Sequence, residues 1–174
     1  VPFGDVQTVG EWLAIDQPVG APRNLHPRRP VQGLECARVE VSGRRLWGWV
    51  KDRWFTPEAF FSEAFVANYC PLVFLEDSGR NRTPDRLPLG ERAPLFERCD
   101  LALKQMVECL RPDWVVGVGA FAARRATEVL SGDSARIGKI LHPSPASPAA
   151  NRGWRQVAEK QLTEQGIFEF GEKS

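Results

Sequence analysis

Residues 137–154 read IGKILHPSPASPAANRGW and hold the strongest indication of the fold. The short apolar run 137–141 predicts a strand that leads directly to His142. Three prolines follow within six residues, and because proline has no backbone N–H and a fixed φ, we expect an ordered, non-helical loop after the histidine. Asn151 can then cap a new helix. A histidine at the carboxyl end of a strand stands where open α/β sheets bind ligands.

Strand-like and helix-like patterns alternate through the rest of the chain. A proline-rich loop occupies 16–40 and contains His26, to which we assign no chemical role. Two further apolar runs predict buried strands over 65–68 and 115–118. Helices are predicted over 5–15, from Ser42 as cap through 50, from Pro57 as first residue, over 88–110 and over 120–130. This alternation predicts an α/β fold with a parallel sheet and helices on both faces.

The composition is that of an ordinary globular domain. The 174 residues suit one domain over 1–174, with 43% hydrophobic and 26% charged residues. A net charge of +1 excludes a general polycation, so contact with nucleic acid would depend on local arginine clusters in loops. No apolar run reaches the roughly 20 residues of a membrane span, and no signal peptide is visible. We therefore expect a protein that is neither secreted nor bound to a membrane.

Four cysteines leave two interpretations open. Four thiolates can hold an iron–sulfur cluster, but Cys36, Cys70, Cys99 and Cys109 form no C-x-x-C pair, and the last two fall in one predicted helix. Buried, reduced thiols in a cytosolic or nuclear protein are the better interpretation.

The segment 117–122 fits the pattern G-x-G-x-x-A between a strand and a helix. This pattern can mark a dinucleotide-binding turn. However, a ribose-binding acid should end the next strand, and that strand instead leads to His142. Close packing of the strand on the helix explains the glycines more simply.

Several motifs taken together resemble the uracil-DNA glycosylase superfamily, and within it the single-strand-selective monofunctional uracil-DNA glycosylases. The first is His142-Pro143-Ser144-Pro145, and the others span the chain from its first residue to about Gly166. They are residues 1–4 (VPFG), 33–36 (GLEC), 40–43 (EVSG), 65–72 (FVANYCPL), 78–84 (SGRNRTP), 115–119 (VVGVG) and 151–154 (NRGW). The resemblance implies a three-layer α/β/α sandwich around a short parallel sheet with strand order 2-1-3-4.

The resemblance also implies a segment before Val1. In this family the sequence Val-Pro-Phe-Gly follows directly after the first catalytic motif, which carries the asparagine that positions the water. We therefore expect the 174 residues to be a piece of a longer enzyme, to lack its first strand and to be inactive alone.

Three residues match the family's substrate-binding positions. Phe3 matches the phenylalanine that stacks on the flipped base, and Asn68 matches the asparagine that reads the pyrimidine edge. His142 matches the catalytic histidine that donates to the uracil O2. Without the resemblance, Phe3 and Asn68 would be read first as structural residues, and the structural and catalytic readings of His142 would be evenly balanced.

Two polar segments match the family's DNA-binding loops. In the second of them, vertebrate members commonly carry arginine and asparagine at the positions of Ala146 and Ser147, and alanine can neither wedge into DNA nor reach a phosphate. The implied DNA-binding residues are Ser78, Gly79, Arg80, Asn81, Thr83, Ser144, Pro145, Ser147, Asn151 and Arg152.

The expected function is hydrolysis of the N-glycosidic bond of uracil in DNA, together with oxidised uracils such as 5-hydroxymethyluracil. The resemblance implies no metal and no cofactor. It implies a monomer that acts on single- and double-stranded DNA containing uracil, in the cytoplasm of a bacterium or the nucleus of a eukaryote. The alternative, if the chain is complete as given, is a non-catalytic module that binds DNA or a damaged base.

Overall fold

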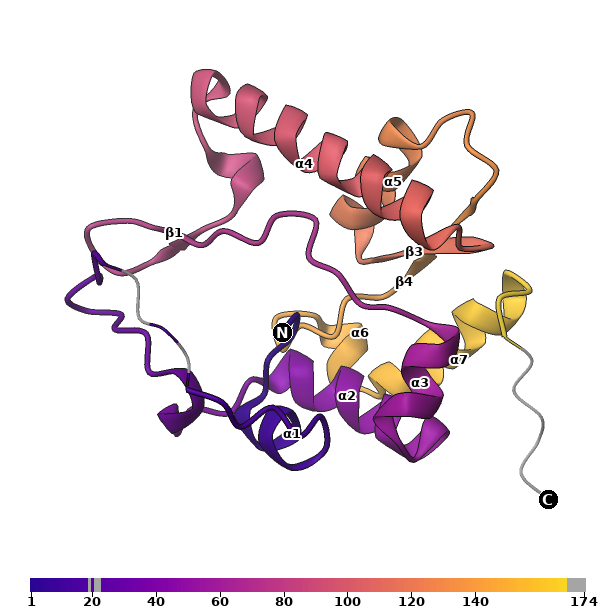
Figure 1. Cartoon of the computed structure of the whole chain (residues 1–174), viewed down its shortest axis with the longest axis horizontal. Coiled ribbons are helices and arrows are strands. Elements are labelled where there is room, and N and C mark those ends of the chain that lie inside the picture. Colours follow the sequence, from indigo (N-terminus) through magenta and orange to yellow (C-terminus); the bar gives the residue numbers. More distant parts are fainter. Residues whose placement is uncertain (19, 21–22, 169–174) are drawn as a thin grey trace. The chain divides into compact units, whose positions relative to one another are not determined.

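The computed structural model describes residues 1–18, 20 and 23–168. These residues form two compact units, Val1–Glu97 and Arg98–Ser174, with the boundary inside the long helix α4 (Leu89–Leu110). Helices and short strands alternate along the chain (Figure 1), which confirms a mixed α/β fold with a small parallel sheet. Within the described ranges, no helix has the length and apolar character that a bilayer span needs.

Aromatic side chains form the core of the first unit. They come from α2 (Val41–Trp54), from α3 (Pro57–Glu63) and from Trp12, which directly follows α1 (Val6–Glu11). Trp47 is 1% exposed, and its ring meets that of Phe60 edge-on at 5.9 Å between centroids. Edge-to-face rings place the positive edge of one ring against the negative face of the other, which adds to the burial energy.

The two helix starts that the sequence predicted in this unit had different outcomes. Pro57 does begin α3, and the Thr56 hydroxyl caps it by accepting from the Ala59 amide at 3.2 Å. The prediction that Ser42 caps α2 was wrong. The cap is Glu40, whose carboxylate accepts from the Ser42 and Gly43 amides, while Ser42 lies buried inside the helix. The helix begins at Val41, so its first unpaired amides are those that the Glu40 carboxylate reaches.

The predicted buried strand over 65–68 was also wrong. The segment forms neither helix nor strand among the described residues, Phe65 is 62% exposed, and Asn68 is exposed. A strand exists only through hydrogen bonds to a neighbour, and an apolar run cannot supply that neighbour. Tyr69 holds the end of the segment, since its ring meets Phe96 of α4 edge-on at 5.8 Å.

Two parallel strands form the sheet of the second unit. They are β3 (Trp114–Val118) and β4 (Arg136–Ile140), paired from Trp114 opposite Arg136 to Val118 opposite Ile140. Helix α5 (Ala120–Val129) connects them and packs on them, with Ala126, Val129 and Leu130 buried against Val115 and Ile137. Both strands were predicted, but most of β3 is half-buried and only Gly117 is fully buried.

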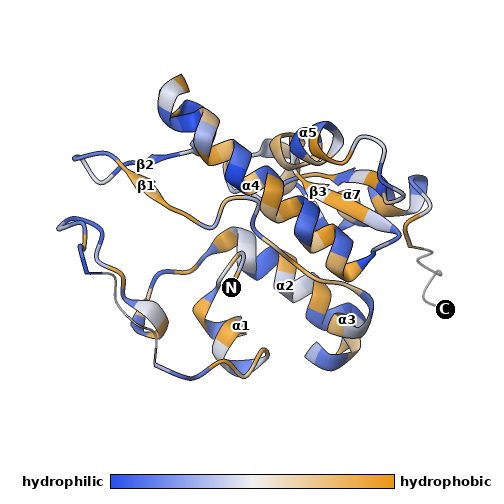
Figure 2. Cartoon of the chain, turned by 45° about the horizontal axis from the view of Figure 1, so that its top comes forward, coloured by the Kyte–Doolittle hydropathy of each residue, from blue (hydrophilic) through white to orange (hydrophobic). Residues whose placement is uncertain are grey.

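Helix α4 confirms the predicted helix over 88–110, and its apolar stripe includes Cys99, Leu103 and Val107. Figure 2 shows the alternating hydrophobic and hydrophilic bands of this helix. All four cysteines are free thiols. The prediction of buried thiols holds only for Cys99, because Cys36 and Cys70 are half-buried and Cys109 is exposed.

The chain after β4 forms two helices. The first, α6 (Pro148–Asn151), has Pro148 at its first turn and Ser147 as its cap. The prediction that this proline-rich segment contains no helix was therefore wrong. The second, α7 (Trp154–Glu164), begins after Gly153 rather than after Asn151. Asn151 does not cap it, because it ends α6 and its side-chain amide donates to the Pro145 carbonyl at 2.9 Å.

Gly117 allows β3 and α5 to approach closely. A Cβ at this position would lie well inside van der Waals contact of the backbone N and Cα of Ala123. This confirms strand-to-helix packing as the role of Gly117. The amide of Gly119 donates to the Ile140 carbonyl at 2.8 Å and so extends the strand pairing by one bond.

We expect Gly117→Ala to lower the free energy of unfolding by about 1–3 kcal/mol, because the added methyl group meets backbone atoms that cannot rotate away. Urea titration followed by circular dichroism measures this change. Gly48→Ala in α2 is the control, since a Cβ there meets nothing within 4 Å, and it should leave stability equal or raised. Equal effects of the two substitutions would contradict this account of the packing.

Candidate functional site

His142 lies two residues beyond the end of β4, at the carboxyl edge of the parallel sheet. Its side chain is half-buried, and its Nδ1 atom is buried. It packs against Gly119, where a Cβ would come within 3.1 Å of the His142 Cβ and 3.4 Å of its Cδ2. Gly119 has φ +93°, a conformation that L side chains rarely adopt. The turn after β3 therefore leaves room for the imidazole at the edge of the sheet.

Helix α7 fixes the backbone of Leu141, the residue before this histidine. Leu141 donates its amide to the Gln161 Oε1 at 2.7 Å, and its carbonyl accepts from the Trp154 indole at 2.6 Å. Trp154 is 3% exposed, and Pro143 is fully buried. His142 thus stands between two residues that are both held in place.

The same helix covers the outer edge of β4. The Gln165 side chain accepts from the Lys139 amide at 2.8 Å and donates to the Lys139 carbonyl at 2.9 Å. A carboxamide that makes both bonds replaces the backbone of a neighbouring strand. No sequence pattern indicated these glutamines, which occur on an ordinary amphipathic helix.

Internal hydrogen bonds hold the loop after Pro143. The Ser144 hydroxyl accepts from the Ala146 amide at 3.2 Å, and the Ser144 carbonyl accepts from the Ser147 amide at 3.0 Å. Pro145, Ala146, Asn151 and Arg152 are exposed on this frame. The implied DNA-binding residues of this loop therefore lie together on a defined surface.

The other implied DNA-binding loop is the turn of a β-hairpin. Strands β1 (Phe74–Leu75) and β2 (Asn81–Arg82) pair antiparallel, with Gly79 at φ +81° in the turn. The Gly79 amide donates to the Glu76 carbonyl at 2.7 Å, and Gly79 itself is buried. The remaining residues implied here, all exposed, are Ser78, Arg80, Asn81 and Thr83. A short 3-10 turn, η2 (Pro84–Arg86), follows.

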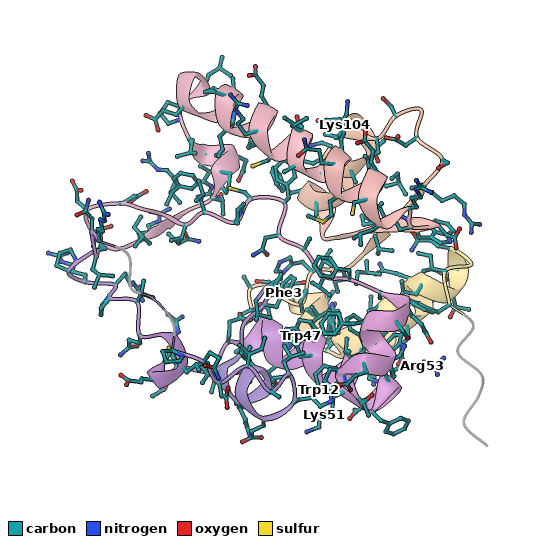
Figure 3. The ribbon with its side chains drawn as sticks, in the orientation of Figure 1. Phe3, Trp12, Trp47, Lys51, Arg53 and Lys104 are labelled. Carbon is teal, nitrogen blue, oxygen red and sulfur yellow. The ribbon has the colours of Figure 1, made fainter. Side chains whose placement is uncertain are left out.

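Phe3 is held at the start of α2. The Trp47 indole donates to the Pro2 carbonyl at 3.1 Å, and the Asp5 amide donates to the Phe3 carbonyl at 2.9 Å. Gly43 leaves room for this carbonyl, because a Cβ there would collide with it. Phe3 has φ +53° and a half-buried ring. Figure 3 shows it beside Trp47, with Trp12 further along the same aromatic group.

The three implied substrate-binding residues belong to different units. Phe3 and Asn68 lie in Val1–Glu97, and His142 lies in Arg98–Ser174. Their meeting around one base remains a prediction. Among the described residues, no group of three or more histidine, cysteine, aspartate or glutamate side chains is arranged to hold a metal ion.

We expect Gln161→Ala to weaken the support of His142, because the substitution removes the acceptor of the Leu141 amide and leaves that amide without this bond. The loss should cost about 1–3 kcal/mol and speed hydrogen exchange at the Leu141 amide. Gln156→Ala, an exposed position on the same helix, is the control. Unchanged protection of the Leu141 amide in Gln161→Ala would contradict this role.

Comparison with known proteins found close relatives. The chain is 47% identical over 170 residues to a single-strand selective monofunctional uracil DNA glycosylase of Bos taurus. Proteins of the same name from Mus musculus and Rattus norvegicus are 46% and 47% identical. These alignments cover 97% of this chain but 61–62% of each relative, so the chain spans about three fifths of their length. No family model matches the chain.

Proposed function

Because the chain belongs to the family of single-strand-selective monofunctional uracil-DNA glycosylases, we propose that it is part of an enzyme that hydrolyses the N-glycosidic bond of uracil in DNA. The observation that carries this proposal is the identity of 47% over 170 residues, which span nearly the whole chain. The substrates include oxidised uracils such as 5-hydroxymethyluracil, in single- and double-stranded DNA, and the enzyme acts as a monomer.

His142 stabilises the leaving group. Cleavage of the glycosidic bond leaves the electron pair on the base and positive charge on the sugar. An imidazole N–H that donates to the uracil O2 becomes a stronger partner as negative charge develops there, so it binds the transition state better than the substrate. The support for this role is the position of His142 at the sheet edge, directly after Leu141, whose amide and carbonyl are both bonded to α7, and before the buried Pro143.

Asn68 selects the base. A carboxamide offers one acceptor and one donor in a plane, which fits the N3–H and O4 of uracil and opposes the reversed pattern of cytosine. Asn68 is the last residue of the segment 65–68 and is exposed, directly before Tyr69, whose ring packs on Phe96. Phe3 supplies the apolar face on which the flipped base stacks, worth about 1–3 kcal/mol.

The complete enzyme is a three-layer α/β/α sandwich, a single domain to which residues 1–174 contribute. In it, another strand lies beside β3, between β3 and the segment 65–68. Two features support this arrangement. Gln165 already bonds the backbone at the outer edge of β4, which favours a further strand at β3, and the segment 65–68 forms no strand pairing in the described part of the chain. The asparagine that positions the attacking water accompanies that strand, so the 174 residues alone are inactive.

DNA is held by the hairpin turn and by the loop after Pro143. Peptide amides, hydroxyls and arginines on such turns contact phosphates without reading sequence. Ser78, Arg80, Asn81 and Thr83 serve on the hairpin, where Gly79 shapes the turn. In the second loop, Ser144 and Ser147 shape the backbone, while Pro145, Asn151 and Arg152 present exposed surface.

We expect a chimera, in which the bovine relative's residues that precede the aligned segment are joined to Val1, to release uracil from a single-stranded DNA substrate. The 174 residues alone should release none. Chimera activity on single-stranded DNA, measured under single-turnover conditions, tests the proposed reaction. Equal DNA binding by both proteins with no release by either would favour the non-catalytic binding module.

In that chimera, we expect His142→Ala to lower the single-turnover rate by roughly 10²–10³-fold, as for the loss of one charge-stabilising donor. Asn68→Ala should lower the rate and also reduce the preference for uracil over cytosine, because the group that rejects cytosine is gone. Gln156→Ala and Asn24→Ala are matched controls at exposed positions. A near-normal rate for His142→Ala, or an unchanged preference for Asn68→Ala, would rule out the assigned roles.

A further inference from the structure

A loop segment from the proline-rich region docks onto the hairpin turn. Residues 26–29 form a tight turn of their own, in which the Arg29 amide donates to the His26 carbonyl at 3.0 Å. His26 Nε2 bonds the Glu76 carbonyl at 3.0 Å, and Arg29 Nε donates to the Gly79 carbonyl at 3.0 Å. Two side chains of one loop thus hold the two backbone carbonyls that bracket the other turn.

The bonds of His26 define its tautomer. Its Nδ1 receives the Arg28 amide at 3.2 Å, so Nδ1 carries no proton, and the Glu76 carbonyl can only accept, so Nε2 carries the proton. A neutral imidazole satisfies both partners at once. His26 therefore joins its own loop to the hairpin through one side chain.

Gly79 is the point of closest approach. A Cβ on Gly79 would lie 3.3 Å from the Arg28 Cβ and 3.3 Å from the Arg29 Cγ. Arg28 therefore lies directly over the turn that also carries Arg80. Both arginines are exposed, and neither takes part in an ion pair found among the described residues.

Positive charge predominates around this contact. The two segments 26–29 and 76–82 hold Arg28, Arg29, Arg80 and Arg82 against Glu76 and Asp77. Arg82 pairs with Glu76 at 3.7 Å, and Arg29 is engaged with the Gly79 carbonyl. Within the part of the chain that the structure describes, Arg28 and Arg80 are the arginines of these segments whose side chains have neither kind of contact, and Arg29 keeps its charge because a carbonyl does not neutralise it.

We propose that residues 26–29 and the turn 76–80 form one composite surface that binds backbone phosphates of DNA. Arg28 contacts phosphate from the docked loop, beside Arg80 on the hairpin. His26 and Arg29 are positioning residues that keep the two turns together. This inference rests on the proposed function, because it takes DNA as the ligand, and it adds a loop distant in sequence to the hairpin. In Figure 1 the two segments meet at the end of the β1–β2 hairpin.

The test measures binding of the chain to a labelled, uracil-free single strand by fluorescence anisotropy at several salt concentrations. Each phosphate contact releases counterions, so loss of one contact should reduce the slope of log K against log salt by about 0.7. We expect this reduction for Arg28→Gln. Arg38→Gln, at an exposed arginine of the neighbouring loop, should keep the wild-type slope. Equal slopes for the two variants, or no binding by the wild-type chain, would overturn the proposal.

The positioning role has its own readout. His26→Ala should reduce the salt slope as Arg28→Gln does although it removes no permanent charge, whereas His26→Gln, which retains a donor for the Glu76 carbonyl, should keep it. A wild-type slope in His26→Ala would overturn the positioning role. Uracil-free DNA separates this test from the reaction, which is measured on the chimera. Excision by the chimera with an unchanged Arg28→Gln slope rejects only this surface, and a reduced slope without excision by the chimera rejects only the reaction.

Discussion

Parallel pairing of β3 with β4 determines where the only histidine of the second unit can stand. The register places Val118 opposite Ile140, and the bond from the Gly119 amide to the Ile140 carbonyl continues the pairing past the end of β3. The two strands therefore end at the same level, and the residues that follow them meet. Because Gly119 has no side chain, the imidazole of His142 fits into the space above the turn. A side chain at position 119 would close the place where the chemistry is proposed.

The hydrophobic pattern of the sequence predicted those helices and strands whose packing partners lie close to them in the chain. The strand–helix–strand unit of β3, α5 and β4 follows from two apolar runs around an amphipathic segment, and α4 follows from its stripe. The segment 65–68 has equally apolar residues but pairs with no strand in the described ranges. The hydrophobic pattern of a sequence indicates which residues are favourable to bury. A strand also needs a neighbouring strand to pair with, and the pattern cannot locate that neighbour. The predicted cap of α2 failed for a related reason, because both Glu40 and Ser42 carry side-chain oxygens that can begin a helix and the pattern does not decide at which of them the helix starts.

The candidate site was predicted only in part. Family resemblance identified Phe3, Asn68 and His142, and each of them is a common structural residue by itself. The hydrogen bonds that hold the loops of the site in place could not be predicted from the sequence. Gln161 and Gln165 bond the backbone of Leu141 and Lys139, and His26 and Arg29 bond the backbone of the hairpin, so each bond joins a side chain to a backbone group distant in sequence. Such bonds follow no period and need no particular residue type. They become visible only when the chain is folded.

In the loop after Pro143, the residues that fix the backbone differ from the residues that are exposed to solvent. Buried Pro143 anchors one end, Gly153 at φ +137° turns the chain at the other, and serine hydroxyls hold the frame between them. Pro145 and Ala146 project from that frame into solvent. Selection can therefore exchange these outward residues while leaving the frame intact. In evolutionary terms, the outward residues of this loop can change without altering the scaffold that carries the histidine.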